Sequence, residues 1–403
     1  MNPRAITERV AWVGVVDWDR RLFDSLIPLP DGTSYNAYLV RGSEKVALID
    51  TVDPSFAPTL LDFLGRVPRV DYVVANHAEQ DHAGSLGFVL ERYPAAKVVC
   101  TPKCKALLID ELHIPEDRFL TVENGATLSL GDRTLEFLHL PWVHWPETMV
   151  TYLREENLLF SCDLFGSHLA ANALYVNDEG TLFDPTGRGR VYEAAKRYYA
   201  EIMIPFRGLI QKHLATLGRY DIRMVLPSHG PIHRKPEFIV DAYRDWASDT
   251  PKNVAVVPYI SMHGSTRQMV ERFIDALTER GVKVERFDLA ATDLGKLAMA
   301  LVDGATVVIG TPTVLAGPHP AAAYAAYLAN ALRPKTRFAS VIGSYGWGGR
   351  TVDTLAGMLT NLKVEMLPPV LIKGAPRMED LRALDALADA VAAKHRAAGL
   401  MAG

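Results

Sequence analysis

Cysteine is scarce in this chain, with three residues among 403, and no two of them form a Cys-x-x-Cys pair. Three thiols cannot build the disulfide framework that stabilises many small secreted proteins. We therefore expect Cys100, Cys104 and Cys162 to be buried or inert thiols in a protein of a reducing compartment.

Long basic runs and a strong excess of one charge are also absent. The net charge is −4, which gives no reason to expect binding to nucleic acid or to an anionic membrane surface. The amino end carries charges at Arg4, Glu8, Arg9 and Asp17 and lacks the apolar core of a signal peptide, so we expect a cytoplasmic protein.

One stretch needs to be tested as a membrane span, because the 29 residues 304–332 contain no Asp, Glu, Lys or Arg. Its length would cross a bilayer. Helix-breaking residues interrupt it, however, at Gly310, Pro312, Gly317, Pro318 and Pro320. The sequence therefore predicts a strand, a loop and an alanine-rich helix in place of a membrane span.

A length of 403 residues predicts two or three domains. Near Asn253 the composition changes to a regular alternation of apolar strands and amphipathic helices, and the polar, proline-containing segment 246–252 precedes this change. We predict one domain over residues 1–249 and a second over residues 253–403.

The densest set of candidate metal ligands lies in six residues, where His77, Glu79, Asp81 and His82 follow an apolar run and precede a glycine. This order places them on the loop that leaves a buried strand. Imidazole and carboxylate donors suit a borderline to hard divalent ion, and Glu79 stands where a zinc hydrolase usually carries imidazole. The cluster therefore favours iron and redox chemistry over a polar loop that happens to contain histidines.

Three further candidate ligands occupy similar positions after apolar runs. His144 lies between two prolines, Asp163 follows the apolar segment 157–162, and His229 precedes Gly230 and Pro231. Each residue alone fits a turn or a helix cap as well as a ligand. Together with the first four they supply seven donors, enough for two metal ions.

The carboxyl-terminal part predicts a doubly wound parallel sheet. Apolar strands are expected at 254–259, 282–289, 306–310, 337–343 and 363–371, with helices between them. Small hydroxyl residues and glycine at 261–266 precede a helix and can cradle an anion with backbone N–H groups.

The ligand pattern His-x-Glu-x-Asp-His, followed by distant His, Asp and His, resembles that of the flavodiiron family, also called A-type flavoproteins. Segments 31–40 and 48–52 also look like this family. The resemblance implies an α/β protein with an amino-terminal metallo-β-lactamase-like αββα sandwich, followed by a flavodoxin-like domain. It also implies that His77, Glu79 and His144 bind one iron, that Asp81, His82 and His229 bind the other, and that Asp163 bridges them.

The second part is similar to flavodoxin, since its phosphate loop lacks both the Rossmann glycine triplet and the Gly-Lys-Ser/Thr ending of nucleotide triphosphatases. This resemblance implies FMN bound by three loops at strand ends. Their residues are Ser261, Met262, His263, Gly264, Ser265 and Thr266; Thr311, Pro312, Thr313 and Val314; and Ser344, Tyr345, Gly346, Trp347 and Gly348. His263 is a departure, because many relatives carry an aromatic residue there.

The resemblance implies an oxidoreductase that reduces dioxygen to water, nitric oxide to nitrous oxide, or both, and we favour dioxygen. Since no Cys-x-x-Cys pair follows the second domain, the electrons should reach FMN from a separate donor such as a rubredoxin, or less commonly a reduced deazaflavin. A head-to-tail homodimer or a dimer of dimers is expected.

Two other functions share these features. A zinc hydrolase of metallo-β-lactamase fold with an appended flavodoxin would not need Glu79 or a flavin, and an electron carrier would not need the complete ligand set. Tyr198, Tyr199 and His168 are candidates to donate a hydrogen bond or a proton beside the metals. The tyrosines also fit an aromatic helix face packed in the core.

Overall fold

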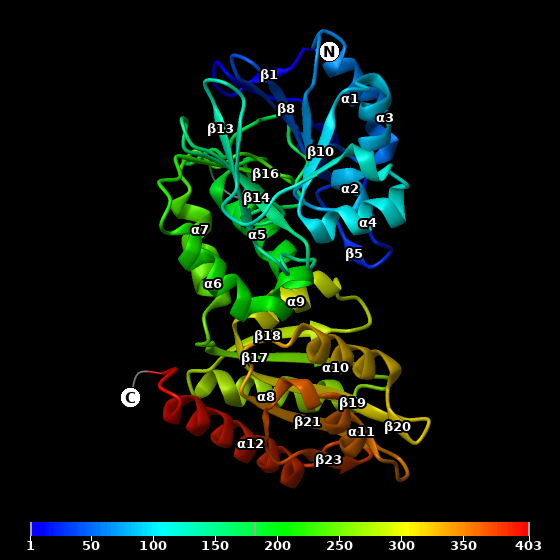
Figure 1. Ribbon diagram of the computed structural model, residues 1–403. Helices are drawn as coiled ribbons and strands as arrows, with labels where there is room; N and C mark the ends of the chain where they lie inside the picture. The colour runs from blue at the N-terminus through cyan, green and yellow to red at the C-terminus, as the bar shows by residue number, and fades with distance from the viewer. Residues whose placement is uncertain (1, 181–182, 402–403) are drawn as a thin grey trace. The chain divides into compact units, whose positions relative to one another are not determined.

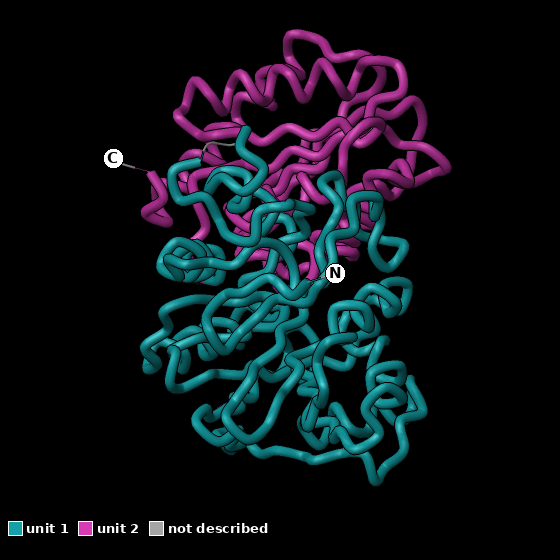
Figure 2. The backbone as a smooth tube through the Cα atoms, turned by 90° about the horizontal axis from the view of Figure 1, so that it is seen from above, with its two compact units in different colours: residues 1–198, 206–247 teal, residues 199–205, 248–403 magenta. Residues whose placement is uncertain are grey.

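The computed structural model describes residues 2–180 and 183–401 and divides the chain into two compact units (Figure 2). The first unit comprises residues 1–198 and 206–247, and the second comprises residues 199–205 and 248–403. Residues 199–205 thus group with the second unit, although they come well before the predicted seam. The domain limits 1–249 and 253–403 stay a prediction, and their end points 1 and 403 lie outside the described residues.

The first unit is built on two mixed sheets (Figure 1). In order across the first sheet the strands are β1 (Arg4–Ala5), β2 (Val10–Trp12), β7 (Tyr38–Arg41), β8 (Val46–Ile49), β9 (Tyr72–Val74), β10 (Lys97–Cys100) and β11 (Phe119–Thr121). Across the second they are β12 (Thr127–Ser129), β13 (Thr134–His139), β14 (Met149–Leu153), β15 (Leu158–Cys162) and β16 (Met224–Pro227). Two small antiparallel sheets of two strands accompany them, β3 (Val15–Asp17) with β6 (Thr33–Tyr35) and β4 (Leu22–Phe23) with β5 (Ile27–Pro28).

Helices lie outside these sheets, with α1, α3 and α4 beside the first and α6 and α7 beside the second (Figure 1). The helices of the unit are α1 (Ala57–Leu64), α2 (Gln80–Ala83), α3 (Leu86–Arg92), α4 (Pro102–Leu112), α5 (Arg188–Tyr198), α6 (Arg207–Leu217) and α7 (Glu237–Ala247). Short 3-10 turns occur at Pro54–Phe56, Glu116–Arg118 and Ile204–Phe206, and a π-helical turn covers Tyr199–Met203.

Parallel pairing decides where the polar loops of the first unit meet. Strands β8, β9 and β10 pair in parallel, and so do β15 and β16. Their apolar residues are almost entirely buried, as expected for strands covered on both faces. The loops after β9, β15 and β16 therefore leave from the carboxyl ends of buried strands, where side chains from distant parts of the sequence can converge.

The second unit has a parallel sheet in the order β18 (Lys283–Asp288), β17 (Lys252–Tyr259), β19 (Gly304–Val314) and β21 (Phe338–Tyr345). Strand β21 then pairs in parallel with β22 (Glu365–Met366) and β23 (Val370–Lys373), while β20 (Gly317–Pro318) folds back on β19. The single strand expected at 363–371 is therefore wrong. Pro368 and Pro369 interrupt it, because a proline has no N–H to donate to the ladder.

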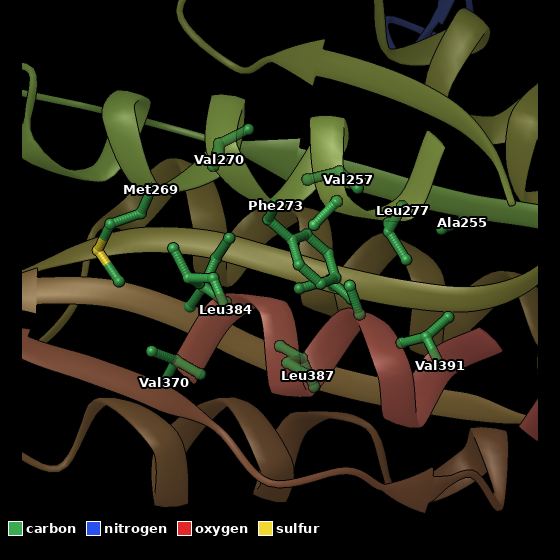
Figure 3. Packing of buried hydrophobic residues seen from close by; sticks show 14 of the residues in the cluster. Ala255, Val257, Met269, Val270, Phe273, Leu277, Val370, Leu384, Leu387 and Val391 are labelled. Carbon is green, nitrogen blue, oxygen red and sulfur yellow. The ribbon is translucent and has the colours of Figure 1, made fainter. Parts of the chain in front are cut away.

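The helices of this unit are α8 (Ser265–Glu279), α9 (Leu294–Asp303), α10 (Pro320–Leu332), α11 (Thr351–Met358) and α12 (Met378–Ala397), with a 3-10 turn at Thr360–Leu362. On one face of the sheet, α8 and α12 enclose a continuous apolar core in which Phe273 of α8 and Leu384, Leu387 and Val391 of α12 pack over β17 and β21 (Figure 3). This is the doubly wound architecture that the sequence predicts.

The uncharged stretch 304–332 forms β19, β20 and α10, so the predicted sequence of strand, loop and helix is confirmed. Within residues 2–180 and 183–401, no helix is long and apolar enough to cross a membrane.

Candidate metal centre and flavin pocket

The seven candidate ligands all lie in the first unit, close to strand ends. His77 follows β9, Glu79 caps helix α2, and Asp81 and His82 lie within α2. The other three come from the loop between β13 and β14 (His144), from the residue after β15 (Asp163) and from the loop after β16 (His229). Segments separated by up to about 150 residues thus contribute to one cluster.

The first group consists of His77, Glu79, His144 and Asp163, whose donor atoms all lie within 4.8 Å of one another. Oε2 of Glu79 is 3.1 Å from Nε2 of both His77 and His144. Oδ2 of Asp163 is 3.5 Å from Nε2 of His77 and 3.9 Å from Nε2 of His144. Two imidazoles and two carboxylates therefore face one point.

The second group contains Asp81, His82 and His229, again with donor atoms within 4.8 Å. Nε2 of His229 is 3.2 Å from Oδ2 of Asp81, and Nε2 of His82 is 3.4 Å from Oδ1 of Asp81. Oδ1 of Asp163 completes this side, at 3.0 Å from His82 and 3.4 Å from His229. Asp163 thus presents one oxygen to each group.

Several of these donor atoms are buried and lack a hydrogen-bond partner. They are both carboxylate oxygens of Asp81, Nε2 of His82 and Oδ2 of Asp163. Buried polar atoms are normally paired, since an unpaired one costs about 1 to 3 kcal/mol. A cluster of unpaired nitrogen and oxygen donors that face each other fits two first-row divalent metal ions.

The electrostatics of the cluster reflect the opposed charges of its side chains. Burial would lower the pKa of His229, but the adjacent carboxylates of Asp163 and Asp81 outweigh it and raise the pKa to about 10. Burial would raise the pKa of Glu79, but hydrogen bonds from His144 and His77 hold it well below its usual value. Because the pKa values of His77, His82 and His229 are all raised, the metal-free cluster holds protons on these imidazoles, and a metal ion must displace them.

Of the three additional candidates, Tyr198 reaches the cluster. Its hydroxyl donates a hydrogen bond of 2.7 Å to Oδ1 of Asp163. The ring of His168 packs against His229 at 4.8 Å between centroids, and its Nδ1 lies 2.8 Å from the hydroxyl of Thr33. Tyr199 belongs to the segment 199–205, which groups with the second unit.

Two acidic residues near the cluster escaped the sequence analysis. Oε1 of Glu147 lies 2.7 Å from Nδ1 of His77 and accepts a hydrogen bond from the backbone of Ala78. Asp50 accepts hydrogen bonds from the backbone and side chain of Asn76, and it groups with His82 and Cys162. Both are buried acids, which is an unusual state for such residues, but no local motif marks either position.

An open cavity of about 540 Å³ adjoins the cluster at Glu79 and Asp81. Phe23 and Trp145 line the cavity with aromatic rings, and Asp24 lines it with a carboxyl group. Burial and the nearby charges of Glu79 and Asp81 raise the pKa of Asp24. The cavity is thus lined by one member of each donor group, Glu79 and Asp81.

The second unit contains the predicted flavin pocket, a cavity of about 270 Å³ between the three strand-end loops. The predicted residues line it, apart from Gly264, Thr311, Val314 and Gly348, and Gly374 is an additional lining residue. Gly264 has a φ of +93° at the start of α8, where Oγ of Ser261 accepts hydrogen bonds from the backbone of Gly264 and Arg267. Trp347 is 76% exposed beside this cavity and offers aromatic surface.

Comparison with known proteins agrees with this architecture. Residues 33–230 match the family model described as ODP family beta lactamase, and residues 257–384 match the flavodoxin model. A nitric oxide reductase of Moorella thermoacetica is 35% identical over 98% of this chain and 99% of its own length. A coenzyme F420H2 oxidase of Methanothermobacter marburgensis is 36% identical over 88% of this chain and 89% of its own.

Solved structures give the same result. The rubredoxin oxygen:oxidoreductase of Desulfovibrio gigas superimposes with a TM-score of 0.93 and 30% identity, covering 99% of this chain and all of that one. The flavodiiron protein of Giardia intestinalis gives a TM-score of 0.91 and 28% identity, covering 98% of this chain and 97% of that one.

The fold and the donor cluster define an oxidoreductase that joins a β-lactamase-like metal domain to a flavodoxin domain. The chain belongs to the flavodiiron family. Membership implies FMN and a di-iron centre as its cofactors, and it does not support the hydrolase alternative.

Proposed function

We propose that this protein reduces dioxygen to water, nitric oxide to nitrous oxide, or both, at two iron ions held by the seven-residue cluster. The observation that carries the proposal is the arrangement of buried, unpaired donors around Asp163. Relatives named nitric oxide reductase and rubredoxin oxygen:oxidoreductase support the same two substrates.

In this proposal His77, Glu79 and His144 hold one iron, Asp81, His82 and His229 hold the other, and Asp163 bridges them. Each iron would then be held by two imidazoles, by one carboxylate of its own and by one oxygen of Asp163. Nitrogen and oxygen donors of this kind suit iron, and four protein ligands leave positions open for a small gas. The carboxylates reduce the net positive charge of the pair and so favour the ferric state after turnover.

The flavin pocket would hold FMN through the 261–266 loop at its phosphate, with the backbone N–H groups at the start of α8 pointing toward the anion. Oγ of Thr266 lies 3.4 Å from Oγ of Ser344, which ties the phosphate loop to the loop expected beside the ring. With both cofactors bound, two ferrous ions and one reduced flavin supply the four electrons that dioxygen needs.

The electron donor, the assembly and the location belong to the same proposal. We expect an external donor such as a rubredoxin, and a head-to-tail homodimer or dimer of dimers. A cytoplasmic location suits Cys100, Cys104 and Cys162, which are free and buried. Analytical ultracentrifugation that finds a fully active monomer would refute the dimer, and reduction of the bound flavin by added rubredoxin tests the donor.

Metal analysis combined with anaerobic stopped-flow tests the activity. The purified protein should contain about two irons and one FMN per chain. After reduction, mixing with dioxygen or with nitric oxide should reoxidise the flavin rapidly with at least one of the gases. Zinc in place of iron, with no reoxidation by either gas, would refute the proposal and favour a hydrolase.

A further inference from the structure

The two metal positions have matched sets of donors. Each is faced by two imidazoles, by one carboxylate of its own (Glu79 or Asp81) and by one oxygen of Asp163. The ligands themselves therefore give little reason for one metal to be easier to oxidise than the other. Any inequality must come from the groups that contact the ligands, and these groups differ between the two sides.

On the first side, a buried carboxylate contacts a ligand. Oε1 of Glu147 lies 2.7 Å from Nδ1 of His77, which fixes the ring so that Nε2 faces the metal position. Glu147 is 2% exposed, its Oε1 also accepts a hydrogen bond from the backbone of Ala78, and its Oε2 has no hydrogen-bond partner. A carboxylate in this position makes an imidazole a stronger electron donor to its metal.

On the second side, the corresponding contact is weaker. Nδ1 of His229 lies 2.7 Å from the backbone carbonyl oxygen of Ser34, which is a neutral acceptor. Asp50 is the carboxylate that approaches His82, but its oxygens accept hydrogen bonds from Asn76 at 2.8 and 2.9 Å. The charge of Asp50 is thus shared with those donors.

Tyr198 adds to the difference through the bridging residue. Its hydroxyl donates to Oδ1 of Asp163, the oxygen that faces His82 and His229, whereas Oδ2 on the first side has no such donor. A hydrogen bond to a carboxylate oxygen withdraws electron density that the oxygen would otherwise give to its metal. The second position is therefore faced by the oxygen of Asp163 that donates less electron density to a metal.

We propose that Glu147 and Tyr198 make the two iron positions unequal, so that the iron at His77, Glu79 and His144 is oxidised first. The one-electron-oxidised pair then keeps its ferric ion on the Glu147 side. This inference rests on the proposed function, and it gives both residues a positioning and tuning role outside the ligand set.

The test is an anaerobic redox titration of the iron- and FMN-loaded protein, in which electron paramagnetic resonance quantifies the mixed-valence pair. Glu147→Gln keeps an oxygen acceptor for His77 but removes the charge, so the iron on that side becomes harder to oxidise. Tyr198→Phe removes the donor to Asp163, so the iron on the other side becomes easier to oxidise. The mean potential of the pair should rise in the first variant and fall in the second.

Both substitutions should nevertheless lower the comproportionation constant of the mixed-valence state, because each brings the two iron potentials closer together. We expect a decrease of about tenfold in each variant, which is the lower end of the effect that mutating the partners of metal ligands typically has on metal affinity or activity. If the ferric ion preferred the other side, the same substitutions would increase the constant, so the sign of the change identifies the side.

Glu136→Gln and Tyr220→Phe are matched controls. Tyr220 donates a hydrogen bond of 2.9 Å to Glu136, a tyrosine–carboxylate pair in the same unit that lies outside the metal cluster. These variants should leave the constant unchanged. An unchanged or increased constant in both test variants, in a protein that holds two irons and reduces a gas, would overturn this inference alone. A protein that holds zinc and reduces neither gas would overturn both this inference and the proposed function.

Discussion

Acid should destabilise helix α12 through a single residue, His395. This side chain is fully buried, with Nε2 at 2.7 Å from the hydroxyl of Thr306 and Nδ1 at 2.8 Å from Oδ1 of Asn253. The neutral ring satisfies both contacts by donating from Nδ1 and accepting at Nε2. Burial lowers the pKa of His395 from 6.5 to about 4, so the unfolded chain binds the proton more readily than the folded one.

The stability that this residue contributes is fully present above pH 6.5, and it is lost as the pH falls toward 4. From these two pKa values, the free energy of unfolding should decrease by about 2 kcal/mol between pH 7.5 and pH 5. A change of about 2 kcal/mol corresponds to about a 30-fold change in an equilibrium constant.

Hydrogen exchange of peptides from α12 measures this effect directly. After correction for intrinsic exchange rates, protection of α12 amides in the wild-type protein should be about 30-fold lower at pH 5 than at pH 7.5. In His395→Gln, which cannot titrate, most of this pH dependence should disappear. Equal losses of protection in the two proteins would refute the assignment to His395.

Three other predictions concern the cofactors. Glu79→Ala or Asp163→Ala should lose iron and gas reduction while retaining FMN, and metal analysis with flavin absorbance checks this; turnover in either variant would contradict the site. Gly264→Ala should weaken FMN binding about tenfold in a fluorescence titration, because a φ of +93° costs a residue with a Cβ about 1 to 2 kcal/mol. The control Gly357→Ala in α11, where an added Cβ also meets no atom within 4 Å, should leave FMN binding unchanged. Iron affinity should rise as the pH is raised toward 10, because His229 has a pKa of about 10 in the metal-free protein and must lose its proton to bind metal. Competition for iron with a chelator at several pH values measures this affinity. An affinity that does not change with pH would contradict the prediction.

Most of the architecture could be predicted from the sequence because its signals are local. Apolar runs mark strands β9, β15, β16 and β17, and polar residues shortly after them mark the loops that form both sites. The order of strands in the second unit follows from the alternation of strand and helix. The break between β22 and β23 was missed, although Pro368 and Pro369 were visible in the sequence.

The groups that contact the metal ligands could not be predicted in the same way. Glu147 is 70 residues from His77 in the sequence, and its segment gives no sign of which histidine it will meet. Tyr198 and Tyr199 look equivalent in the sequence, and nothing in their segment indicates that the hydroxyl of Tyr198 donates to Asp163. These contacts between side chains distant in the sequence depend on how the sheets pack, and they cannot be predicted from a single sequence.

Each cofactor site lies wholly within one unit, since the metal donors fall between residues 77 and 229 and the flavin pocket between 261 and 374. Among the described residues, every metal donor belongs to the first unit and every residue that lines the flavin pocket belongs to the second. During synthesis the amino-terminal half emerges first, so all seven metal donors are made before the first residue of the flavin pocket. A substitution in the flavin pocket therefore leaves every metal donor in place, and a substitution of a metal donor leaves the lining of the flavin pocket unchanged.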